Sequence, residues 1–129
     1  MIRTYKQADT YLQAGRNKDN RPLPGNSTRL IRMDNDDIAV VYHRTAVVVF
    51  HPNGSVSAYH GGWRSKTTAD RIEEYTGGRT EGAIYPGWYG SRMVRNGSDD
   101  WKLHVGGKAY AVPGRIPAAA MKRQRAGVA

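Results

Sequence analysis

The sequence predicts an α+β fold built on a four-stranded antiparallel β-meander with flanking helices. Short apolar runs alternate with turn signals between residues 28 and 60, an amphipathic helix follows, and further alternating runs fill residues 83–112. A chain of 129 residues has the length of one domain. We therefore expect a single domain with four parts: an N-terminal helix and basic loop (1–27), the meander and its helix (28–78), a second small antiparallel β unit (79–112) and a basic C-terminal tail (113–129).

The N-terminal part is predicted to be a helix and then a loop. Apolar residues recur at helical spacing over residues 2–14, and Gly15 is a typical stop signal. The segment that follows is rich in Gly, Asn and charged residues. Pro22 and Pro24 argue against regular structure in it.

The meander is predicted from four strands and three turns. Asp34–Asp37 forms the first turn, because Asp and Asn side chains bond their own backbone. A tight turn at Arg44-Thr45 comes next, and Asn53-Gly54 favours a two-residue type I′ hairpin. The predicted strands are Thr28–Met33, Ile38–His43, Ala46–His51 and Val56–His60.

A helix is predicted after the meander. Thr68 is a suitable N-cap, and Asp70 in the first turn would complement the helix dipole. Gly77-Gly78 should end the helix. Its expected buried stripe is Ala69, Ile72 and Tyr75.

The second β unit shows a strong hairpin signal. Strand candidates are 83–85, 88–95, 101–105 and 108–112. The last two should pair residue 105 with residue 108 across Gly106-Gly107. That register places one set of side chains on a buried face: Trp101, Leu103, Val105, Tyr110 and Val112.

The charge distribution favours a polyanionic partner. The net charge is +9, with seven basic and two acidic residues in 1–33 and eight basic and two acidic residues in 82–129. Aromatic residues next to Arg and Lys could stack on bases and neutralise phosphates. The candidate nucleic-acid-binding residues are Arg16, Lys18, Arg21, Arg64, Lys66, Trp88, Tyr89, Arg92, Arg95, Lys122, Arg123 and Arg125.

The sequence contains no motif for several common kinds of site. Without cysteine there is no disulfide, thiolate nucleophile or Cys-based zinc site. No apolar run reaches the roughly 18 residues of a membrane span, and no secretory signal or phosphate-loop motif is present. No spacing of Ser, His and Asp singles out a triad. We therefore expect a non-enzymatic protein without cofactor, metal or membrane partner.

The histidines do not predict a metal site. With a two-residue turn at Asn53-Gly54, His51 and His60 would share a sheet face about 13 Å apart, at roughly 3.3 Å per residue. His43 would fall on the opposite face. Ligands of one zinc ion cannot be that far apart.

A sequence pattern links the chain to a known group. The pattern comprises His43-x-Thr45, Pro52-Asn53-Gly54, Gly61-Gly62-Trp63 and Thr67-Thr68-x-x-Arg71-Ile72. Over about residues 10–76 the chain resembles a largely uncharacterised group of small proteins from tailed phages and related mobile elements. Members carry an aspartate where this chain has Ala46. The resemblance implies a phage origin and a host-cytoplasm setting, and it implies no activity.

These observations lead to one leading hypothesis and three alternatives. We expect a phage-encoded, basic, non-enzymatic binding protein that acts on nucleic acid or a nucleoprotein complex. The alternatives are an inhibitor or modulator directed at a protein of the host or defence machinery, a virion-associated structural protein, and a nuclease or other hydrolase.

Overall fold

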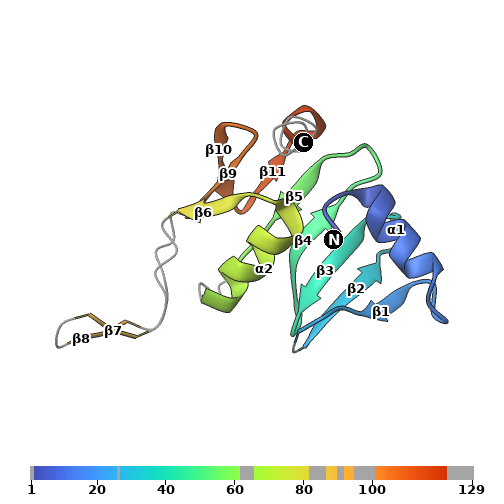
Figure 1. Ribbon diagram of the computed structural model, residues 1–129, viewed down its shortest axis with the longest axis horizontal. Helices are drawn as coiled ribbons and strands as arrows, with labels where there is room; N and C mark the ends of the chain where they lie inside the picture. The colour runs from blue at the N-terminus through green and yellow to red at the C-terminus, as the bar shows by residue number, and fades with distance from the viewer. Residues whose placement is uncertain are drawn as a thin grey trace.

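The fold is α+β, as the sequence predicts. The computed structural model describes residues 2–25, 27–61, 66–81, 87–89, 92–94 and 101–121, without the side chains of Lys66 and of the two short segments 87–89 and 92–94. All strands pair antiparallel, in sheets of six, three and two strands (Figure 1). Within the described part of the chain, no helix is long and apolar enough to cross a membrane.

The elements follow one another along the chain with short connections. The helices are α1 (Tyr5–Gln13) and α2 (Lys66–Thr76), and residues 118–121 form one further helical turn. The strands are β1 (Asn20–Pro22), β2 (Thr28–Arg32), β3 (Ile38–Tyr42), β4 (Thr45–Phe50), β5 (Val56–Ala58), β6 (Arg79–Glu81), β7 (Gly87–Tyr89), β8 (Arg92–Val94), β9 (Trp101–Val105), β10 (Lys108–Val112) and β11 (Gly114–Ile116).

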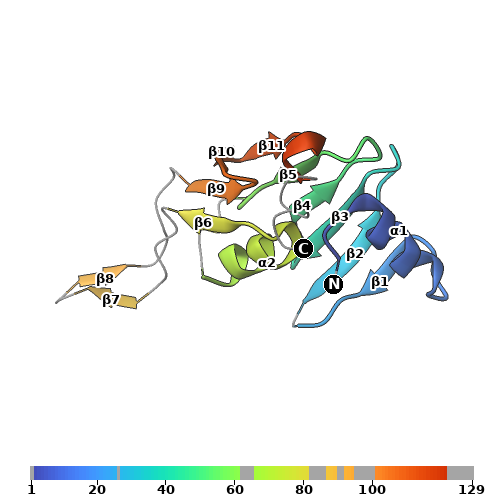
Figure 2. The same cartoon turned by 45° about the horizontal axis from the view of Figure 1, so that its top comes forward.

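The six-stranded sheet has the order β1-β2-β3-β4-β5-β11, and its register defines two faces. Both α1 and α2 lie against the same face (Figures 1 and 2). On this helix face, ladder partners form the row Leu30, Val40, Val48 and Ala58. On the far face, they form the row Ile31, Ala39, Val49, Ser57 and Arg115.

One apolar core joins the helices and the two larger sheets. Ala8 and Leu12 of α1 pack in the same cluster as the α2 stripe. Trp101 and Leu103 of β9 extend the cluster into the three-stranded sheet. The stripe predicted for α2 is confirmed, since Ala69, Ile72 and Tyr75 are buried.

The three-stranded sheet has the order β10-β9-β6. Its β9–β10 hairpin confirms the predicted register, with Val105 opposite Lys108 and Trp101 opposite Val112. Strand β6 was not predicted, because it contains only one β-branched residue, Thr80, between two charged ones.

The predicted four-stranded meander is confirmed as β2-β3-β4-β5, and two short edge strands that were not predicted extend its sheet to six. Strand β1 pairs with β2 inside the predicted loop. Pro22 is tolerated in this edge strand. A proline has no backbone N–H, and an edge strand leaves some of its N–H positions without a ladder partner. Strand β11, in the predicted tail, pairs with β5 and places Ile116 opposite Val56.

The start of α2 also differs from the prediction. The helix begins at Lys66, so Thr68 is inside the first turn and fully buried rather than at the N-cap. Asp70 consequently lies beyond the first turn. Gly77 ends the helix as predicted, with φ +75°.

The prediction of one continuous strand over residues 88–95 is wrong. The chain makes two strands there, β7 and β8, which pair with each other and place Tyr89 opposite Arg92. The candidate strand 83–85 lies outside the described residues.

Two turns of the meander differ by one residue from the prediction. The first is His43-Arg44, since Tyr42 pairs with Thr45, and a bulge interrupts the β3–β4 pairing between Val40 and Val41. The second spans three residues, Pro52–Gly54, because His51 N–H donates to Ser55 O at 3.0 Å. A three-residue loop with a positive-φ Gly54 replaces the two-residue type I′ turn.

Candidate functional site

The predicted basic loop is largely used for internal contacts. Lys18 donates its ammonium group to the carbonyl oxygens of Gln13 and Gly15 and so closes the C-terminal end of α1. Arg21 donates to Tyr11 O at 2.8 Å, and its guanidinium lies 4.0 Å from the centre of the Tyr11 ring. Arg16, the third predicted residue in this loop, is exposed and makes no such contact with the described residues.

The other predicted binding residues are not brought together by described contacts. Lys66 is the first residue of α2. Strand β7 contains Trp88 and Tyr89, and strand β8 begins with Arg92. The remaining candidates lie outside the described residues: Arg64, Arg95, Lys122, Arg123 and Arg125.

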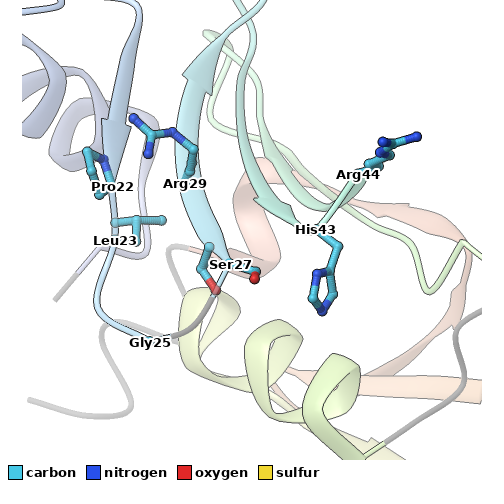
Figure 3. A pocket seen from close by; sticks show the side chains of 8 residues that line it. Pro22, Leu23, Gly25, Ser27, Arg29, His43 and Arg44 are labelled. Atoms are coloured by element: carbon cyan, nitrogen blue, oxygen red, sulfur yellow. The ribbon is translucent and has the colours of Figure 1, made fainter.

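A basic pocket lies at one end of the six-stranded sheet. It has a volume of about 470 Å³ and is formed where β1, β2 and the β3–β4 turn meet (Figure 3). Arg29 and Arg44 point to opposite sides of it, and the His43 ring points toward α2 (Figure 3). The lining residues are Pro22, Leu23, Gly25, Ser27, Thr28, Arg29, His43 and Arg44.

The backbone around this basic pocket is held in an uncommon conformation. Ser27 has φ +54° and His43 has φ +57°, a region that non-glycine residues rarely adopt. His43 N–H donates to Ser27 O at 2.8 Å, so the two strained residues hold each other. Such strain costs of order 1–3 kcal/mol per residue and is concentrated at functional sites.

The charge at the basic pocket is positive. Arg29 Nε donates to the neutral amide oxygen of Asn20 at 2.6 Å. Arg71 of α2 donates from Nε to Thr28 Oγ1 at 3.1 Å, and its guanidinium occupies the space beside Gly25. Neither Arg29, Arg44 nor Arg71 forms a salt bridge with a carboxylate among the residues that the structure describes.

A second candidate site lies on the far face of the same sheet. His51 Nδ1 lies 3.0 Å from Asp37 Oδ1, and His51 Nε2 lies 2.7 Å from Ser57 Oγ. The exposed fraction of the side chain is 9% for His51 and 15% for Asp37, and Ser57 is buried. Asp37, His51 and Ser57 thus form a hydrogen-bonded chain, here called the Ser–His–Asp cluster.

The three-residue turn explains why this cluster exists. Because His51 pairs with Ser55 rather than with Val56, Ser57 falls on the far face, diagonally across from His51. Asp37, directly before β3, reaches the other ring nitrogen. The turn itself is stabilised by Asn53, whose Oδ1 accepts from Ser55 N–H at 2.9 Å. The two-residue turn expected from the sequence would place Ser57 and His51 on opposite faces of the sheet, so this cluster could not be predicted from it.

Arg115 completes the Ser–His–Asp cluster from the edge strand β11. Its Nη2 lies 3.3 Å from His51 Nε2 and 3.5 Å from His51 Nδ1. Nearly equal distances to both ring nitrogens place the guanidinium against the face of the imidazole. Arg115 is opposite Ser57 in the ladder and is itself exposed.

The remaining histidines stand apart from the Ser–His–Asp cluster. The His60 ring centre lies 5.2 Å from that of Trp101. His104 Nε2 lies 3.2 Å from Glu81 Oε2 in the small sheet. No group of three His, Cys, Asp or Glu side chains suited to a metal ion occurs among the described residues.

No protein-family model, curated protein or solved structure matches this chain. Function is therefore argued from the two sites themselves.

Proposed function

We propose that the protein binds nucleic acid and that the basic pocket is part of the binding surface. The observation that supports this proposal is a pair of arginines, Arg29 and Arg44, on either side of one pocket and without a described acidic partner. Unpaired guanidinium groups are the side chains that most readily pair with phosphate oxygens.

The arrangement favours an extended chain over a compact anion. Arg29 and Arg44 diverge from the pocket rather than converge on its centre (Figure 3). A compact anion could meet only one of them, whereas a strand that crosses the pocket presents successive phosphates to both. The exposed ring of His43, which lines the pocket, offers a flat surface beside that path.

The rest of the chain is consistent with the proposal. The net charge of +9 gives a long-range attraction for any polyanion. The resemblance to small phage proteins supports a phage-encoded protein that acts in the host cytoplasm, where phage genomes and transcripts are at hand.

The proposal is tested by fluorescence anisotropy with labelled single-stranded DNA, duplex DNA and RNA at about 50 and about 200 mM salt. Replacing both Arg29 and Arg44 by Ala should weaken binding. On duplex DNA it should also lower the slope of log K against log salt by about 0.9 for each lost phosphate contact.

The matched control is a double variant, Arg79→Ala with Lys108→Ala. Both residues are exposed, and both lie on the three-stranded sheet. This control removes the same charge and should leave most of the affinity. Equal losses in the two double variants would reject the basic pocket as the site. Absence of binding to all three ligands at about 50 mM salt would reject nucleic acid as the partner.

A further inference from the structure

We propose that Ser57 is a nucleophile activated by His51 and Asp37, and that the Ser–His–Asp cluster hydrolyses small carboxylic esters. This activity goes beyond nucleic-acid binding and uses a different face of the molecule. It belongs to the hydrolase class that the sequence left as an alternative.

The hydrogen bonds have the polarity that a serine nucleophile requires. A neutral histidine carries one proton, and the Asp37 carboxylate at 3.0 Å accepts only from a donor, so it selects the Nδ1–H tautomer. Nε2 is then the acceptor and takes the hydrogen bond of the Ser57 hydroxyl at 2.7 Å. Nucleophile, base and orienting acid therefore stand in the order that general-base catalysis needs.

The reaction follows from these positions. As Ser57 Oγ bonds to the ester carbon, its proton moves to His51 Nε2, and the imidazolium is stabilised by Asp37. The tetrahedral intermediate collapses by breaking the bond to the alcohol oxygen, which takes the proton from Nε2. Water then attacks the acyl carbon and gives a proton to Nε2. The bond from that carbon to Ser57 Oγ breaks, Oγ takes the proton back from Nε2, and the carboxylic acid leaves.

Arg115 is placed to stabilise the oxyanion. In a sheet the backbone N–H groups are used by ladder partners, so they are poor donors for a substrate oxygen. The Arg115 guanidinium instead lies 3.3 Å from Nε2, the same nitrogen that Ser57 Oγ contacts, and carries a full positive charge.

In this proposal the substrate reaches Ser57 past Arg115, its ladder partner on the edge strand. Ser57 is 2% exposed, but it lies on the far face and not under the helices. Arg115 is on an edge strand and its side chain is exposed, so the proposal requires that side chain to rotate away when a substrate enters. Only small substrates fit this route, which is why we infer small esters.

The first test is covalent labelling with a small alkyl fluorophosphonate, read by intact mass and peptide mapping. One adduct per chain on Ser57 is expected, and Ser57→Ala should remain unlabelled. Asp37→Asn should react at least about 100-fold more slowly, because the amide no longer selects the productive tautomer. Ser55→Ala is the matched control, since that hydroxyl bonds to Asn53 at 2.7 Å and not to His51. It should label at the wild-type rate.

The second test does not depend on ester turnover. In a Ser57→Cys variant, the thiol next to His51 should alkylate with iodoacetamide at lower pH than the thiol of a Ser55→Cys variant, with a midpoint at least one pH unit below. A wild-type protein without adduct, together with equal midpoints in the two variants, would show a purely structural hydrogen-bond cluster and overturn the proposal. Ser57→Ala should bind nucleic acid normally, so the two proposed functions fail separately.

Discussion

At the scale of single residues, Arg32 shows how a charge is accommodated at the margin of the core. Arg32 shares the helix face with Ile38, its ladder partner, which is fully buried. Its Nη2 lies 2.5 Å from Asp9 Oδ1, and its Nη1 donates to the Tyr5 hydroxyl at 3.3 Å. Arg32 therefore fastens α1 to β2 while its charge is compensated at the edge of the core.

This ion pair predicts a loss of stability in acid. The hydrogen bond from Arg32 holds the pKa of Asp9 below its usual value. The stabilisation that this ion pair gives to the fold is fully present above the usual pKa, about 3.9. It is lost as the pH falls through the lowered pKa. Asp9→Asn should therefore reduce the free energy of unfolding at neutral pH by about 0.5–1 kcal/mol, a small amount because the Asp9 side chain is 41% exposed.

Urea unfolding at a series of pH values measures this effect. The difference between wild type and Asp9→Asn should shrink below about pH 4. Asp34→Asn, at an exposed turn position, is the control and should show no such convergence. A difference that persists unchanged into acid would mean that the carboxylate charge is not what Arg32 needs.

At the scale of elements, the junction from α2 to β6 is tightly packed. A Cβ on Gly78 would lie 2.7 Å from His104 O and 2.6 Å from Val105 Cγ2. The carbonyl oxygen is part of β9 and cannot move without breaking the sheet. Glycine at this position therefore allows the helix end to lie directly on the small sheet.

Gly78→Ala should consequently lower the free energy of unfolding by about 1–3 kcal/mol. Gly15→Ala provides the control, because a Cβ there would meet Arg21 Cδ at 3.0 Å, a side-chain atom that can shift more readily than a strand carbonyl. That variant should change stability by no more than about 0.5 kcal/mol. Thermal unfolding of both variants measures the comparison, and equal effects would refute the packing argument.

Some elements could be predicted from the sequence and others could not. The α2 stripe and the β9–β10 register were predictable, because helical and strand periodicity are strong over these segments. Strands β1 and β11 were not, because three-residue edge strands with Pro or Gly carry almost no periodic signal.

The candidate sites were harder to predict than the elements. A turn of three residues instead of two moved Ser57 to the far face beside His51, since one step in register exchanges the faces of a strand. Arg29, Arg44 and Arg71 come together only through tertiary packing. The basic residues that the sequence suggested, Lys18 and Arg21, instead stabilise the end of α1.

At the scale of the whole molecule, the two larger sheets share one core. The apolar cluster runs from Leu12 of α1 through Phe50 to Leu103 of β9. Strand β11 follows β10 after a single residue, so this part of the chain belongs to both sheets. The single domain predicted from the sequence therefore has a specific physical meaning: neither sheet should unfold without the other.

Ile116 of β11 is the residue with which to test this cooperativity. It is 1% exposed and pairs with Val56, at the place where the chain leaves the small sheet and joins the large one. Ile116→Ala should lower the free energy of unfolding by about 2–4 kcal/mol, and Ile116→Val by about 1 kcal/mol. Hydrogen exchange should show the same loss for the amides of β3 and of β9, because both sheets open in one transition. Faster exchange in β9 with unchanged exchange in β3 would instead divide the molecule into two independent units. The graded response of the Ala and Val variants ties the result to the buried volume at this position rather than to a general loss of the fold.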